Sequence, residues 1–237
     1  MRAVRRSALA VTALALAAPA ALAPSGIASA APAKPTTPAA KLLLTQGEFP
    51  AGYQVQKVSP KELSEITDSV GTGISGARVT PAHCAPTIDR AALGRAAGMP
   101  IVVAVNEAKR TALSETLSSA GSLDNALRIP AGCENIRIEM NPKPGSADRV
   151  VMNATSAPVA LPGAPKGARA VFTRATGTVT VDGEDTRFVQ EQLIGGEQVR
   201  GYAVLLVSTT VSDTGRADRA GFTQALTAAT NKVRTAK

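Results

Sequence analysis

Three β-rich runs near the C-terminal end dominate the pattern of apolar and polar positions. In residues 171–181 apolar side chains alternate with polar ones, which is typical of a strand with one buried face. Residues 203–207 are apolar without interruption, as in a strand covered on both faces. Glycine-containing segments at 182–185 and 195–198 separate the runs and suit tight turns. The pattern predicts an antiparallel three-stranded meander over 171–211, with its last run at the centre of the sheet.

Shorter strands and helices are predicted before the meander. Apolar alternation or continuous apolar runs indicate strands at 53–58, 101–105 and 135–140, and residues 111–117 either continue the second of these or pair with it. Helical turns are expected at 42–44, after the capping box formed by Ser59 and Glu62, and at 87–97 and 122–127.

An amphipathic helix is predicted to close the chain. Asp213 or Thr214 can cap its first turn. Its apolar positions recur at helical spacing, at Ala217, Phe222, Ala225, Leu226, Ala229 and Val233. Together with the absence of any repeat, this order of elements predicts an α+β fold. We expect a twisted, mostly antiparallel sheet packed by short helices and the C-terminal helix.

The first thirty residues have the three parts of an export signal. A basic start is followed by an Ala/Leu/Val-rich segment and by Ala28-Ser29-Ala30, a small-x-small cleavage motif. We expect cleavage between Ala30 and Ala31, by the Sec route in preference to the twin-arginine route. An uncleaved anchor is the alternative, but prolines at 19 and 24 interrupt the apolar segment before it could span a bilayer.

The sequence divides the full chain into three predicted parts. Residues 1–30 are the signal peptide, 31–40 form a mobile Pro/Ala-rich tether, and 41–237 form a single α+β domain. The sequence therefore predicts a secreted protein of the medium or cell envelope, with no transmembrane span after cleavage.

Charge and composition exclude some partners. The chain has 26 basic and 18 acidic residues, and three of the arginines lie in the leader, so the mature chain keeps an excess of five positive charges. The basic residues are scattered along the chain. The chain has no Trp, two Tyr and four Phe, so stacking platforms for bases or sugars are hard to build. Nucleic acid is not an expected partner, whereas an anionic envelope surface stays open.

Cys84 and Cys133 are the only cysteines, and export favours a disulfide between them. Such a bridge would close a loop of about 50 residues and stabilise the fold by about 4 kcal/mol in the chain-entropy model. A thiol nucleophile or a metal ligand would need partners that the chain supplies poorly, because His83 is the only histidine.

No catalytic set, cofactor site or metal site is predicted. The G-x-G-x-x-G match at 71–76 lacks a preceding strand, and the acidic cluster at 182–185 suits a turn better than a calcium loop. Glu191 paired with Asp185 or Glu197 could form a carboxylate hydrolase, although nothing in the sequence fixes their separation.

The order of motifs also suggests a family. An export signal and tether are followed by LLLTQGEFPAGY at 42–53, TPAHC at 80–84, IVVAV at 101–105, a second cysteine, a meander and a closing helix. This order resembles the exported sensor-like domains of actinobacteria, including the extracellular domain of mycobacterial kinase H and related lipoproteins. The kinase-type domains carry more cysteines, and the lipoproteins carry a lipid-bearing cysteine that is absent here. The resemblance implies a twisted antiparallel sheet packed by helices around a cleft, and it supplies no functional residue.

The function expected from these observations is binding without catalysis. We expect a secreted, sensor-like domain of the cell envelope that binds an unidentified ligand, either a small apolar molecule or a partner protein in the envelope. The alternatives are the carboxylate hydrolase and a basic protein that adheres to the cell wall.

Overall fold

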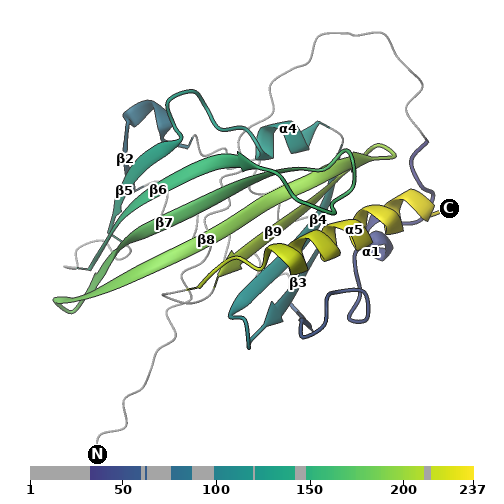
Figure 1. Cartoon of the computed structure of the whole chain (residues 1–237), viewed down its shortest axis with the longest axis horizontal. Helices are drawn as coiled ribbons and strands as arrows, with labels where there is room; N and C mark the ends of the chain where they lie inside the picture. Colours follow the sequence, from purple (N-terminus) through teal and green to yellow (C-terminus); the bar gives the residue numbers. More distant parts are fainter. Residues whose placement is uncertain are drawn as a thin grey trace, which may run out of the picture.

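One antiparallel sheet organises the structure (Figure 1). The computed structural model describes residues 33–59, 62, 76–86, 99–119, 121–141, 148–210 and 215–237. Over these ranges the sheet has nine strands in the order β1-β3-β4-β9-β8-β7-β6-β5-β2. The strands are β1 (Gln54–Gln56), β2 (Arg78–Thr80), β3 (Ile101–Asn106), β4 (Thr111–Ser119), β5 (Asn135–Met140), β6 (Arg149–Val159), β7 (Arg169–Val181), β8 (Glu184–Val199) and β9 (Tyr202–Thr210). The helices in the same ranges are α1 (Ala39–Leu42), the 3-10 turn η1 (Ala82–Cys84), α4 (Ser122–Ala126) and α5 (Arg219–Thr235).

The predicted α+β class and C-terminal meander are confirmed. Strands β7, β8 and β9 are sequential antiparallel neighbours, and the meander extends backward through β6 and β5. The prediction that the last run lies at the centre of the sheet and is covered on both faces is wrong, because the central strand is β8, with β9 beside it, and Leu205 and Val207 of β9 are half-buried. In β3, which the continuous apolar run at 101–105 predicts, only Ala104 and Asn106 are buried and the other residues are half-buried.

Gly195 and Gly196 do not form the second turn of the meander, which corrects the sequence prediction. They lie inside β8, and the turn comes later, at Arg200 and Gly201, where φ is 47° and 77°. A Cβ at Gly196 would lie 2.1 Å from the Val204 carbonyl oxygen, a contact that real side chains do not make. These glycines therefore serve close packing across the strand and not backbone reversal.

Helix α5 packs on one face of the sheet against β8 and β9 (Figure 1). The predicted apolar stripe is confirmed: the buried residues of the helix are Gly221, Phe222, Ala225, Leu226, Ala229, Thr230 and Val233. The N-cap is Asp218, whose side chain accepts a hydrogen bond from the Gly221 amide at 3.1 Å. The prediction that Asp213 or Thr214 caps this helix is therefore wrong, and both residues lie outside the described ranges.

The N-terminal segment completes this core. Leu42, Leu43, Leu44, Phe49 and Tyr53 are buried together with the apolar side of α5. The backbone amides of Thr36 and Thr37 donate to the Lys237 carbonyl, at 2.8 and 3.2 Å. This part of the predicted tether therefore packs against the C-terminal end of α5 and does not extend away from the domain.

Two predictions made from the sequence, the capping box at Ser59 and the disulfide, are confirmed in the described residues. Ser59 and Glu62 exchange the reciprocal hydrogen bonds of a capping box, at 2.7 and 3.2 Å. Cys84 and Cys133 form the predicted disulfide. The predicted signal peptide with its cleavage position at Ala30 and Ala31, residues 71–75 of the glycine motif at 71–76, and the helix at 87–97 lie outside the described residues. None of the helices in the described ranges combines the length and apolar character needed to cross a membrane.

Candidate ligand-binding pocket

The sheet face against which α5 packs extends beyond the helix across β7, β6, β5 and β2 (Figure 1). We call this part of the sheet the polar wing. Strand register decides which side chains share that face, because alternate residues of paired strands point to the same side. Glu139 pairs with Val151, and Val151 pairs with Thr178, so these three lie in one row across the wing. Arg149 and Thr180 form the next pair on the same face.

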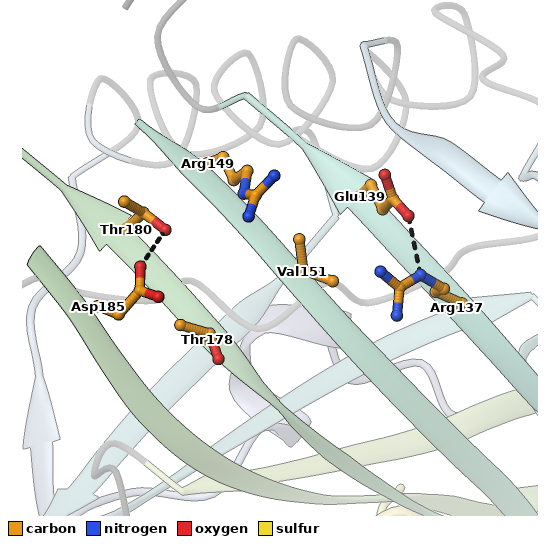
Figure 2. A pocket seen from close by; sticks show the side chains of 7 residues that line it. All are labelled: Arg137, Glu139, Arg149, Val151, Thr178, Thr180 and Asp185. Carbon is orange, nitrogen blue, oxygen red and sulfur yellow. Dashed lines mark hydrogen bonds and ion pairs between the residues drawn. The ribbon is translucent and has the colours of Figure 1, made fainter. Parts of the chain in front are cut away.

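These rows line a pocket of about 210 Å³ (Figure 2). The lining residues are Arg137, Glu139, Arg149, Val151, Thr178, Thr180 and Asp185. On one side Arg137 Nε donates to Glu139 Oε1 at 2.8 Å, and on the other Thr180 Oγ1 donates to Asp185 Oδ1 at 2.6 Å. Figure 2 shows Arg149 between these two pairs. The volume is smaller than that of a typical drug-sized site and suits a group of a few atoms.

Positive charge exceeds negative charge around the pocket. Arg78 lies opposite Glu139 across β2 and β5, and Arg187 lies opposite Thr178 across β8 and β7, so both share the lining face. With Arg137 and Arg149 this gives four guanidinium groups against the carboxylates of Glu139 and Asp185. The hydrogen bond from Arg137 lowers the pKa of Glu139, and the charges of Arg137, Arg78 and Arg149 act in the same direction. Glu139 is therefore ionised at neutral pH.

Arg149, unlike Arg137, keeps its donors available. Among the described residues it has no hydrogen-bond or ion-pair partner, whereas Arg137 is bound to Glu139. Its side chain is exposed. An arginine presents five N–H donors in a planar fork that matches a carboxylate or phosphate group. The pocket thus offers a free guanidinium flanked by threonine hydroxyls.

The acidic cluster at 182–185 is part turn and part pocket. Asp182 and Gly183 have φ values of 51° and 83°, which is the conformation of a two-residue hairpin turn. The predicted turn role is confirmed there. Asp185 lies beyond the turn on β8, where Thr180 orients it toward the pocket, a role that the sequence did not indicate.

The carboxylates proposed for a hydrolase are kept apart by β8. Asp185, Glu191 and Glu197 are spaced six residues apart on one face of the strand, and six residues of strand extend about 20 Å. Glycoside hydrolases need their two carboxyl groups within about 5 to 10 Å. Glu191 instead pairs with Arg174 at 3.5 Å and accepts the Ala217 amide at 2.9 Å, and Glu197 pairs with Arg234 at 3.0 Å. These glutamates hold α5 and the loop before it on the sheet.

The remaining candidate, His83, lies beside the disulfide. It belongs to η1 and is exposed. One of its ring nitrogens and the sulfurs of Cys84 and Cys133 lie within 4.8 Å of one another, the one such group of potential metal ligands in the described ranges.

A buried carboxyl group, Glu115, lies on the core side of β4. It has no solvent exposure, and one oxygen accepts the Leu44 amide at 2.8 Å while the other has no partner. Burial raises the pKa of Glu115 to about 7, although the Leu44 hydrogen bond and the charge of Lys232 oppose the shift. It lies inside the protein and not in a pocket.

Apart from Asp185, the residues that line the pocket were not candidates on the basis of sequence. Arg137, Thr178 and Thr180 were assigned correctly to polar strand faces, but such faces are ordinarily solvated and carry no motif. The available signal was the clustering of arginine and threonine on those faces, and register was needed to bring them together. Comparison of the chain with models of known families, with curated proteins and with solved structures found no match.

Proposed function

We propose that this protein is an exported, non-enzymatic binding domain that takes a small anionic group in the pocket on the polar wing. The observation that carries the proposal is Arg149, a guanidinium with unoccupied donors in a hollow that further arginines surround. A carboxylate or phosphate group would accept hydrogen bonds from Arg149 and from the hydroxyl of Thr178. The surrounding surplus of positive charge would draw such a group toward the pocket.

A binding role is also supported by the properties of the two pocket carboxylates. The lowered pKa of Glu139 makes it a poor proton donor at neutral pH, and Asp185 is held by the Thr180 hydroxyl. General acid catalysis needs a carboxyl group whose pKa lies near the working pH. Export and a sensor-like role rest on the leader sequence and on the resemblance described above.

An apolar ligand between sheet and helix has less support. Phe222, Leu226 and Val233 of α5 have no solvent exposure and fill that space against Leu193 and Leu206. A ligand would have to displace packed side chains, each of which stabilises the core by about 1.5 to 3 kcal/mol. The polar pocket offers a binding site without that cost.

The proposal can be tested by NMR titration with two kinds of probe. Inorganic phosphate and acetate should shift backbone resonances of β5, β6 and β7 around Arg149, and Arg149→Ala should abolish those shifts. Lys57→Ala removes an exposed positive charge beyond β1, at the other edge of the sheet, and should leave them unchanged. A medium-chain alcohol serves as the apolar probe. Equal shifts with phosphate or acetate in the Arg149→Ala and Lys57→Ala variants would refute the anionic site. Shifts that occur only with the alcohol, and only at core residues, would also refute it.

A further inference from the structure

The chain has one histidine and two cysteines, and the fold brings all three side chains together. His83 and Cys84 belong to the 3-10 turn η1, whereas Cys133 comes from the segment between α4 and β5. The imidazole lies against Gly132, the residue before Cys133: a Cβ built there would be 3.5 Å from His83 Nε2. The backbone at Gly132 has a φ of 79° and no side chain, which leaves room for the ring.

Two thiolates and an imidazole are a zinc-binding set. Structural and catalytic zinc sites are built from cysteine sulfur and histidine nitrogen, and three protein ligands leave a fourth position for water. In the disulfide the sulfurs are bonded to each other at 2.05 Å and neither is a thiolate. We propose that the reduced protein binds one zinc ion through His83, Cys84 and Cys133, so that disulfide and metal site are alternative states of the same three residues.

The required movement is small. Zinc lies about 2.3 Å from sulfur and about 2.0 Å from nitrogen, so a tetrahedral site needs its ligand atoms about 3.5 to 3.8 Å apart. All three ligand atoms already lie within 4.8 Å of one another. The two sulfurs must separate and the imidazole must approach, which rotation of three side chains can supply. Neither cysteine lies in a strand of the sheet, so the ladder of backbone hydrogen bonds is not disturbed.

The exchange of states follows ordinary thiol chemistry. The thiolate form of a dithiol reagent attacks one sulfur of the disulfide, and the Cys84–Cys133 bond breaks. The second thiol of the reagent then displaces the bound cysteine from the mixed disulfide and forms a disulfide within the reagent. Two electrons and two protons pass to the cysteines. Zinc then replaces the two thiol protons, which leave to solvent. Both reagents can reach the site, because His83 is exposed and Cys84 is half-buried.

The experiment uses cobalt(II) as a spectroscopic probe, followed by zinc. The purified protein is reduced with a dithiol, freed of reagent under nitrogen, and titrated with cobalt(II). We expect one metal ion per chain with a thiolate-to-cobalt charge-transfer band, which zinc abolishes by displacement. The oxidised protein should show no band. His83→Ala should weaken zinc binding by at least about tenfold, since even outer-shell partners of metal ligands are worth 10 to 100-fold.

Several results would overturn the proposal. These are a reduced protein that gives no charge-transfer band, an oxidised protein that binds zinc equally well, and a His83→Ala variant with unchanged zinc affinity. Circular dichroism covers the case in which reduction unfolds the chain. Zinc should then restore the native spectrum of the wild type and not that of the Cys84→Ser variant, and failure to restore it counts against the site.

Discussion

Glu115 carries a carboxyl group in the apolar core, and its replacement by glutamine should change how stability depends on pH. The residue is fully buried on β4, and one of its oxygens accepts the Leu44 amide. The Glu115→Gln substitution keeps the shape of the side chain and an oxygen for that hydrogen bond. It removes the ability to ionise, so it isolates the free-energy cost of a buried negative charge.

The magnitude follows from the shift in pKa between the two states. The pKa of Glu115 rises from 4.5 to about 7 on folding, so between these pH values the folded protein binds more protons than the unfolded chain. Stability must then fall as pH rises through this window, and the loss levels off about one pH unit above the folded pKa. At 1.36 kcal/mol per pKa unit the total cost is about 3 kcal/mol.

Urea denaturation of wild type and variant between pH 4.5 and 8.5 measures this cost. The free energy of unfolding of the E115Q variant, relative to wild type, should increase by about 3 kcal/mol from pH 4.5 to about 8 and then stay constant. Taking the difference between the free energies of unfolding of variant and wild type at each pH cancels the contributions of the other titrating groups. Glu107→Gln, at an exposed carboxyl in the β3–β4 turn, should give parallel curves. Parallel curves for Glu115→Gln as well would show that the buried carboxyl does not titrate as described.

Two further substitutions test the packing of the sheet and the start of α5. Gly196→Ala places a Cβ 2.1 Å from a carbonyl oxygen of β9 and should lower the free energy of unfolding by about 2 kcal/mol, whereas Gly47→Ala, whose Cβ meets open space, should change it little. Equal melting temperatures of these two variants would contradict the close-approach role. Asp218→Ala removes the cap on the Gly221 amide and a hydrogen bond from the Tyr53 hydroxyl, and should cost about 1 to 2 kcal/mol by the same assay. A variant as stable as the wild type would show that α5 begins without this cap.

The candidate pocket shows the limit of sequence reasoning about function. The polar faces of residues 135–140 and 172–180 are visible in the alternation of each strand taken alone. The pocket exists only because β5, β6 and β7 pair in one register, and a shift by one residue would turn Arg149 to the opposite face. The sequence could not select these positions from other exposed arginines and threonines.

Local patterns determined the elements of this protein, because the period of apolar residues and the chemistry of caps act over a few neighbouring positions. The amphipathic stripe of α5, the alternation of β5 and the capping box at Ser59 were all predicted on that basis. Contacts between distant segments decided the rest. The dipeptide Gly195-Gly196 signals a turn when the sequence is taken alone. In the structure it lies inside β8, because Leu123 and the backbone of β9 pack against Gly196. Only the assembled fold supplied the burial of Glu115 and the placement of the His83 ring against Gly132, since contacts between distant segments leave no mark on either segment alone.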